Sequence, residues 1–275
     1  MVKKKNGYGI AFLVFAFIFN PYSMAHASDE GNLSANDIVE KANCASYYQG
    51  NDGRAQVSMR ITDSQGRKRQ RRFTILRRND VTSDALCKDQ KFYVYFLRPA
   101  DVNKTAFMVW KHVEKDDDRW MYLPALDLVK RIAASDERTS FVGSDFFYED
   151  VSGRNATEDN HELINTTNNF FVLKSSPKEP MAVEFSYYMA WIHRKTFIPV
   201  KIEYFNKAGK KYRVYEALKV DNIEGYSTVT KSRMKDLRTK GETVISYNKV
   251  KYNVGLPDNI FTERYLRNPP KKHLR

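Results

Sequence analysis

Short segments in which apolar and polar residues alternate recur along most of this chain. In the first of them, Val57, Met59 and Ile61 alternate with polar residues, which is the period-two pattern of a strand with one buried face. About ten such segments follow at short spacing, with few helical stretches between them. There is no βαβ alternation and no long repeat, so the pattern predicts a mainly β fold on one antiparallel sheet that curls or closes. The segments are 56–62, 68–78, 92–97, 107–110, 120–123, 161–174, 183–192, 200–205, 212–220, 228–234 and 243–250.

Two stretches depart from this period. Residues 36–48 are predicted to form a helix, because Ser34 or Asn36 can cap its first turn and Gly50 can end it. The apolar residues of 126–150 lack period two, so we expect that stretch to be a helical or irregular lid over the sheet.

The first 27 residues have the pattern of a cleaved secretory signal peptide. Three lysines at 3–5 precede an apolar run at 10–19 that is too short to span a bilayer comfortably. The run is followed by Ala25-His26-Ala27, an A-x-A cleavage site. Cleavage is expected after Ala27, and the mature protein should be periplasmic; a retained membrane anchor is the alternative.

The remaining chain is long enough for one large β domain, expected at residues 28–267. Residues 268–275 contain two prolines and several basic residues, which predicts a loose basic tail. The formal net charge of +13 suits an anionic partner such as phospholipid head groups or an acidic protein. Export makes nucleic acid the poorest of these candidates.

The chain has two cysteines, Cys44 and Cys87. In an oxidising compartment such a pair is compatible with one disulfide, and two free buried thiols are the alternative. A disulfide here would stabilise the fold by about 3–4 kcal/mol on the chain-entropy estimate.

Large aromatic side chains are dense between Arg119 and Val151, where Pro124 and Gly143 interrupt them. The whole chain contains 17 Phe and 17 Tyr, so the inner face of a curled sheet would carry many rings. Covering elements can fill such a face completely, which gives a core, or partly, which leaves a pocket. Composition and spacing leave both possibilities open.

The sequence of this aromatic stretch resembles the signature of LolA-like outer-membrane lipoprotein-sorting proteins. The similar residues run through Arg119–Leu126, Val129–Ile132 and Ser140–Val151. The resemblance extends upstream to Phe96–Val102 and Lys104–Trp110, and more weakly downstream to Leu256–Thr262. It therefore covers most of the mature chain.

This resemblance implies a half-barrel, a strongly curved antiparallel sheet covered by helices, with an apolar cavity that accepts acyl chains. Nine residues are then expected to line or gate the cavity, although each could equally be packed core. They are Phe73, Ile75, Phe92, Phe107, Trp120, Tyr122, Phe141, Phe146 and Phe147.

Basic side chains near the strand ends could hold phosphate head groups or an acidic partner, because the planar guanidinium suits both. The alternative is a solvated strand face whose charges discourage aggregation. These residues are Arg69, Arg71, Arg77, Arg78, Lys130 and Arg131.

The residues that could carry catalysis or hold a metal form no convincing pattern. The run Asp116-Asp117-Asp118 near His112 reads as a solvated turn, because three consecutive side chains cannot all face one ligand. His161 and His193 lack metal-ligand spacing, and Asp145 and Glu149 lie inside the family-like signature. We therefore expect no enzyme, no metal and no cofactor.

These observations predict a monomeric periplasmic carrier or chaperone for lipid, or for the acyl part of lipoproteins. It would contact membranes transiently and not bind nucleic acid. The branch of the family that the signature resembles is often associated with RND-type exporters, so an exporter or an outer-membrane acceptor is an expected partner. An accessory protein of such an exporter that carries nothing is the alternative, and an envelope hydrolase is a third possibility.

Overall fold

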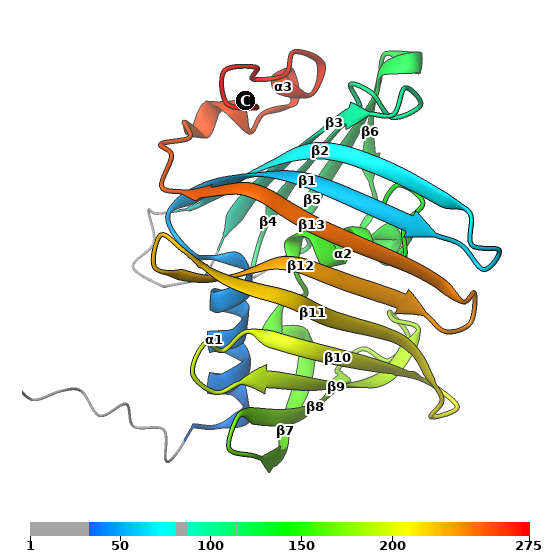
Figure 1. Ribbon diagram of the computed structural model, residues 1–275, viewed down its shortest axis with the longest axis vertical. Helices are drawn as coiled ribbons and strands as arrows, with labels where there is room; N and C mark the ends of the chain where they lie inside the picture. Colours follow the sequence, from blue (N-terminus) through cyan, green and yellow to red (C-terminus); the bar gives the residue numbers. More distant parts are fainter. Residues whose placement is uncertain (1–32, 81–86, 88, 114) are drawn as a thin grey trace, which may run out of the picture. The chain divides into compact units, whose positions relative to one another are not determined.

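Thirteen strands form one open, curved antiparallel sheet in the computed structural model (Figure 1). The structure describes residues 33–80, 87, 89–113 and 115–275, so the predicted signal peptide lies outside the described residues. Ser34–Arg275 form one compact unit. The strands are β1 (Asp52–Thr62), β2 (Lys68–Asn79), β3 (Gln90–Arg98), β4 (Ala106–Lys111), β5 (Asp118–Leu123), β6 (Leu128–Ile132), β7 (Asp159–Thr166), β8 (Phe170–Pro177), β9 (Phe185–His193), β10 (Pro199–Asn206), β11 (Lys211–Ile223), β12 (Tyr226–Asp236) and β13 (Gly241–Tyr252).

The sheet consists of two meanders that meet at one seam. Strands β1–β6 form the first meander, β7–β13 form the second, and β1 pairs with β13. At this seam Met59 lies opposite Ile245 and Val57 opposite Tyr247. Strands β6 and β7 are the free edges, so the sheet is not closed. The predicted curved antiparallel fold is confirmed.

The helical elements are short. They are α1 (Ala35–Tyr47), α2 (Tyr148–Ser152) and α3 (Glu263–Arg267), with 3-10 turns η2 (Pro124–Leu126), η3 (Ala134–Asp136), η4 (Ala156–Glu158) and η5 (Asp258–Ile260). The predicted first helix is confirmed as α1. The Ser34 hydroxyl accepts a 3.2 Å hydrogen bond from the backbone N–H of Asp37, whose side chain accepts one of 2.9 Å from the N–H of Ser34. This reciprocal capping satisfies two donors that a helix start leaves free.

Two predicted boundaries are wrong. Residues 161–174 form two strands rather than one, because a turn at 167–169 separates β7 from β8. The predicted lid at 126–150 begins too early, since Leu128–Ile132 is the edge strand β6. An edge strand that is mostly exposed needs no alternation of apolar and polar residues, so its sequence carries no period-two signal.

The two faces of the sheet have different covers. The inner face is defined by Val57, Phe73, Phe96 and other side chains that pack against Phe141 and Phe146. Residues 133–158, here called the covering segment, and α1 lie over this face. On the outer face, side chains from the first meander such as Leu76, Tyr93 and Trp120 pack against the C-terminal residues.

The C-terminal residues 253–275 are a packed part of the fold. The segment lies beside the first meander, in red in Figure 1. The Tyr93 hydroxyl donates a 2.7 Å hydrogen bond to the carbonyl of Tyr265, and the Thr74 hydroxyl donates one of 3.1 Å to the carbonyl of Leu274. Leu274 is 8% exposed, so the prediction of a loose tail is wrong. The prolines and lysines of this segment suggested an exposed tail, although Leu274 near its end is a buried apolar residue.

The cysteines join two distant parts of the unit. Cys44 in α1 and Cys87 in the connection between β2 and β3 form a disulfide, with their Cα atoms 5.5 Å apart. The bond therefore fixes the last turn of α1 beside the start of β3, at one end of the inner face.

We predict that Leu274→Ala lowers the free energy of unfolding by about 2 kcal/mol, because it removes a buried side chain from the outer-face core. Urea unfolding monitored by tryptophan fluorescence measures the change. Leu126→Ala, at a position that is 69% exposed, is the matched control and should leave stability unchanged. Equal stability of the two variants would show that the last residues do not anchor the fold.

Candidate functional site

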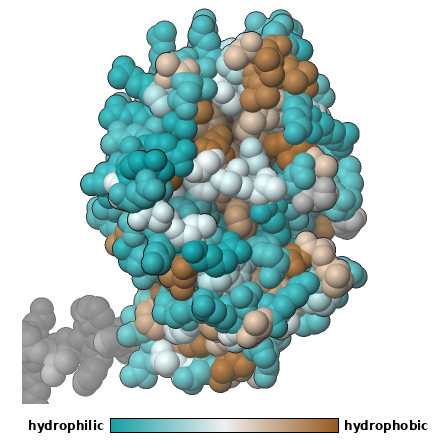
Figure 2. All heavy atoms as spheres, turned by 90° about the vertical axis from the view of Figure 1, so that its right-hand side faces the viewer, coloured by the Kyte–Doolittle hydropathy of each residue, from teal (hydrophilic) through white to brown (hydrophobic). Residues whose placement is uncertain are grey.

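A cavity of about 350 Å³ lies between the inner face of the sheet and its cover. Strands β1–β3 and β8–β13 form its wall, and α1 and the covering segment close it. This volume falls near the lower end of the range of about 300–1,000 Å³ that is usual for small-molecule pockets. Figure 2 shows the molecule from the right-hand side of Figure 1, where apolar side chains are visible in hollows of an otherwise hydrophilic surface.

One half of the cavity is lined by hydrocarbon. Phe73 and Ile75 from β2 and Phe92 from β3 face Phe141 and Phe146 from the covering segment. The rings of Phe73 and Phe141 lie 6.2 Å apart in an edge-to-face arrangement. These surfaces offer no hydrogen-bonding group, so this half suits an alkyl chain.

The other half is lined by tyrosines. They are Tyr47 from α1 and Tyr188, Tyr204, Tyr215 and Tyr247 from β9, β10, β11 and β13. Burial, assisted by the nearby charge of Asp150, raises the pKa of Tyr247 to about 12. Burial also raises the pKa of the other four phenols, so all five hydroxyls stay protonated at neutral pH. The site therefore combines an alkyl wall with a wall of neutral hydrogen-bond donors and acceptors.

Five of the nine predicted cavity residues line the cavity, and the other four lie elsewhere. Phe73, Ile75, Phe92, Phe141 and Phe146 line the cavity. Phe107 lies in the core behind it, with its ring 5.6 Å from that of Phe141, and Phe147 packs under the guanidinium of Arg213.

Trp120 and Tyr122 belong to the outer-face cluster, so their predicted place in the cavity is wrong. Successive side chains of a strand point to opposite faces, and sequence alone did not fix which face of β5 is the inner one.

The predicted basic residues do not form one cluster. Arg77 lines the cavity. Arg69 donates to the carbonyl of Gly143 at 3.2 Å, and the buried Arg71 pairs with Asp101 at 3.0 Å.

The other three basic residues lie elsewhere. Arg78 lies near Asp258, Arg131 pairs with Asp118, and Lys130 is exposed on the edge strand β6. A single head-group site made from all six is therefore excluded by their placement on different parts of the sheet.

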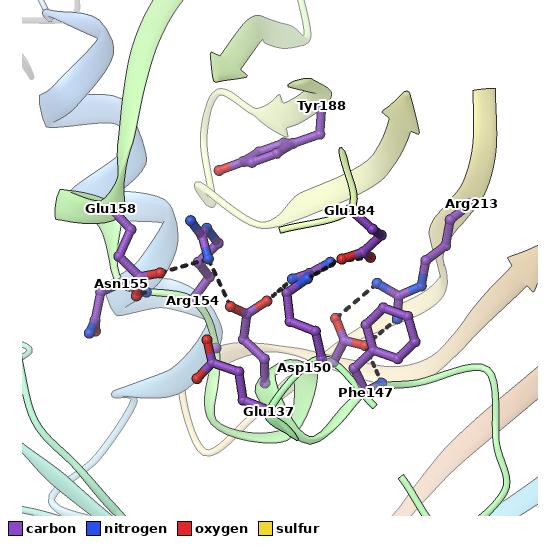
Figure 3. Close-up of polar contacts among 12 residues, drawn as sticks. Glu137, Phe147, Asp150, Arg154, Asn155, Glu158, Glu184, Tyr188 and Arg213 are labelled. Carbon is purple, nitrogen blue, oxygen red and sulfur yellow. Dashed lines mark hydrogen bonds and ion pairs between the residues drawn. The ribbon is translucent and has the colours of Figure 1, made fainter. Parts of the chain in front are cut away.

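A network of buried ion pairs, which sequence reasoning missed, holds the covering segment (Figure 3). Arg154 pairs with Glu149 at 2.9 Å, with Glu158 at 2.6 Å and with Asp159 at 3.0 Å. Because Asp159 begins β7, this arginine joins the end of the covering segment to an edge of the second meander.

Further pairs tie the same segment to the second meander. Arg138 pairs with Glu149 and forms a bidentate contact with Glu184 at 2.7 and 2.8 Å. Burial alone would raise the pKa of Glu184, but the hydrogen bonds and charge of Arg138 lower it to about 2. Arg213 from β11 pairs with Asp150 and lies over the ring of Phe147, 3.9 Å from its centroid.

The first meander also holds the segment. Lys111 from β4 is 1% exposed and donates to the carbonyls of Ser152 and Gly153 at 2.8 and 2.9 Å, at the end of α2. Burial lowers the pKa of this amine to about 8. A Cβ on Gly153, whose φ is +81°, would lie 2.6 Å from the ring of Tyr47, so only glycine fits there.

Three carboxylates, those of Glu137, Glu149 and Glu158, have oxygens within 4.8 Å of one another. Each of them pairs with an arginine: Glu137 with Arg119 at 2.9 Å, Glu149 with Arg138 and Arg154, and Glu158 with Arg154. Guanidinium groups therefore already supply the positive charge that a cation would bring. The group fits a structural network better than a metal site.

The acid run after β4 is not the solvated turn that sequence predicted. Asp117 is almost fully buried and pairs with Arg119 at 2.7 Å, while Asp118 contacts His112 at 3.1 Å. Among the residues that the structure describes, no histidine or cysteine lines the cavity, although His161 contacts the hydroxyl of the lining Ser175 at 2.8 Å from outside it.

The fold and the cavity define the class: an open antiparallel half-barrel with an apolar interior, as in LolA-like proteins. A DUF1329 family protein from Desulfovibrio piger has 28% sequence identity and a TM-score of 0.76, over 84% of this chain and 97% of that one. A domain from Vibrio parahaemolyticus described as that of an outer membrane lipoprotein-sorting protein has 24% identity and a TM-score of 0.75, over 85% and 98% of the two chains. A LolA superfamily protein from Nitrosomonas europaea has 21% identity and a TM-score of 0.65, over 85% and 100%.

A family model with the description "uncharacterized protein" matches residues 88–268. The chain belongs to this DUF1329-like family, and its fold is that of the LolA superfamily. The resemblance seen in the sequence is thereby confirmed. Functionally curated proteins gave no match.

The network leads to a prediction of how the stability of the fold depends on pH. Burial and the charge of Glu149 raise the pKa of Glu137 from 4.5 to about 7. The folded state therefore favours the protonated form, and this contribution to stability is present below pH 4.5 and is lost as the pH rises to about 7. We predict that Glu137→Gln, which is always neutral, loses less stability over this interval than the unaltered protein.

Urea unfolding at both ends of the interval measures the difference. Glu162→Gln, at an exposed position on β7, is the control and should keep the original pH dependence. A pH dependence in Glu137→Gln that matches the unaltered protein would show that Glu137 titrates normally.

Proposed function

We propose that this protein is a periplasmic carrier that holds the acyl chain of a lipid or lipoprotein in the inner-face cavity. The observation that supports this most is the cavity itself, an unfilled apolar space on the curved sheet between β1–β3 and the covering segment. Lipoprotein sorting is the role in the description of the Vibrio parahaemolyticus relative, which shares the fold.

Hydrocarbon burial supplies enough free energy for such a cargo. Each methylene removed from water contributes about 0.8 kcal/mol, so even ten of them give a gross gain of about 8 kcal/mol. No specific polar contact is needed for useful affinity. The alkyl wall of Phe73, Phe92 and Phe146 is suited to this non-directional interaction.

Export from the cytoplasm is supported by two features. The predicted signal peptide ends at Ala27, and the Cys44–Cys87 disulfide is typical of an oxidising compartment. Among the residues that the structure describes, every helix is too short or too polar to cross a bilayer.

Loading requires movement of the cover. Besides the packing of Phe141 and Phe146, the covering segment is joined to the sheet by ion pairs and hydrogen bonds, among them Arg213 with Asp150 and Thr243 with Asp145 at 2.6 Å. Water and membrane head groups can replace such contacts more readily than they replace apolar packing. We infer that the covering segment moves aside as a unit when an acyl chain enters.

Native mass spectrometry of gently purified protein tests the carrier function. A carrier should retain a lipid or lipoprotein fragment that denaturation releases. Protein that is repeatedly free of lipid but binds an RND-type exporter tightly would instead support the accessory role. The exporter itself remains a predicted partner.

A cavity-filling substitution gives a sharper test. We predict that Ala45→Trp, in the part of α1 that lines the cavity, lowers acyl-chain binding at least tenfold while the protein stays folded, because the ring occupies existing space. Ala208→Trp adds the same ring in the exposed turn between β10 and β11 and should bind normally. Binding of a fluorescent fatty-acyl probe measures both, and unchanged binding by Ala45→Trp would remove the cavity from the function.

A further inference from the structure

One arginine of the cavity differs from the other buried arginines. Arg119, Arg138, Arg154 and Arg213 each contact at least one carboxylate. Within the described part of the chain Arg77 contacts none, and its hydrogen bonds go to neutral oxygens, the carbonyl of Gln49 and the side chain of Asn79 at 2.9 Å. A guanidinium removed from water without a counter-ion is costly unless a ligand supplies one.

The electrostatics of Arg77 agree with this geometry. Burial lowers its pKa to about 10, and Tyr252 and Asp52 oppose that shift only in part. The pKa values of Arg138, Arg154 and Arg213 are raised, because their carboxylate partners outweigh burial. Among the described residues, Arg77 is thus a cation that Asp52 offsets only in part and that no carboxylate contacts directly.

The surroundings of Arg77 form a polar end of the cavity. Its guanidinium lies against Gly53, where a Cβ would be 3.6 Å from Nη2. Tyr252 donates to the side-chain oxygen of Gln49 at 3.2 Å and contacts the Thr228 hydroxyl at 2.8 Å. These polar residues line the same cavity as the phenylalanines.

The charges that line the cavity favour an anion at this end. Arg54 and Lys251 lie at its rim, but Arg54 donates to the carbonyl of His273 on the outer face and Lys251 is exposed, so Arg77 is the cation that faces this end. The only carboxylates among the described lining residues are those of Glu149 and Asp150, and both are paired with arginines of the network. Around Gln49 and Gly53 the described lining residues therefore place the guanidinium of Arg77 and no carboxylate.

The hydrocarbon half begins directly beyond this end. Ile75 and Phe73 lie on the same inner face of β2 as Arg77, at increasing distance from it, and Phe73 packs against Phe141. Four residues of strand place Phe73 about 13 Å from Arg77. A chain anchored at Arg77 can thus lie along Ile75 with its tail between the phenylalanine rings.

We propose that the cargo is an anionic amphiphile, an alkyl chain that ends in a carboxylate or a phosphate, with its charged group bound to Arg77. This inference rests on the proposed carrier function and narrows it, since the acyl chains of a lipoprotein bring no such anion into the cavity. Carboxylate and phosphate both match the planar fork of a guanidinium.

Displacement of the neutral fluorophore 1-N-phenylnaphthylamine tests the assignment with three ligands of equal chain length. These are palmitate, hexadecyl phosphate and methyl palmitate, each used below its aggregation limit. We expect both anions to bind about tenfold more tightly than the ester. This is the gain in affinity that a partly solvated, charge-assisted hydrogen bond typically provides. A preference for only one of the two anions would support the proposal and identify the head group. Inorganic phosphate alone should not displace the fluorophore.

Variants on one strand separate charge from folding. In Arg77→Gln the ratio of anion affinity to ester affinity should fall to about one, while the affinity for the ester stays unchanged. Arg77→Lys should keep part of the preference for anions. Arg72→Gln, at an exposed position of β2 that does not line the cavity, should keep all of it. Equal binding of anions and ester by the unaltered protein, or a preference that persists in Arg77→Gln, overturns the inference. Failure of all three lipids to displace the fluorophore would instead refute the carrier function.

Discussion

The pairing of β1 with β13 is the contact on which the rest of the structure depends. It joins the two meanders by strand pairing, and it makes a single sheet of thirteen strands. A twisted sheet of this width must curl, so one of its faces becomes a concave wall. One helix of 13 residues and an irregular segment are too small to fill that wall, and the space left over is the cavity.

The cover is held by buried ion pairs in addition to the apolar packing that it shares with the sheet. Strand pairing and apolar packing fix the wall. Phe141 and Phe146 pack the covering segment against this wall, and Arg138, Arg154 and Arg213 hold it further through carboxylates. Buried pairs of this kind contribute little net stability compared with apolar packing, but they specify one arrangement. A cover that is positioned partly by exchangeable polar contacts suits the proposed carrier function. The disulfide fixes the last turn of α1 to the connection between β2 and β3.

Much of the fold could be predicted from the sequence. The alternation in β1 and the capping residues at Ser34 are local signals, so their elements were located within a few residues. The edge strand β6 was missed because an exposed edge does not need an apolar face. The end of the chain was misjudged because its polar composition outweighed Leu274, whose burial depends on a surface that the sheet creates far away in sequence.

The candidate site was predicted less completely, and the reason lies in which face each strand turns inward. The sequence by itself determined that Phe73 and Ile75 share a face of β2 and that Trp120 and Tyr122 share a face of β5. Only the tertiary structure decided that the first pair faces the cavity and the second faces the C-terminal segment. The same holds for Arg77. The sequence placed it among six basic residues, and only the fold shows that it faces the cavity without a direct carboxylate contact from the described residues. Side-chain alternation is local, whereas the direction of curvature and the choice of cover depend on contacts between residues far apart in the chain.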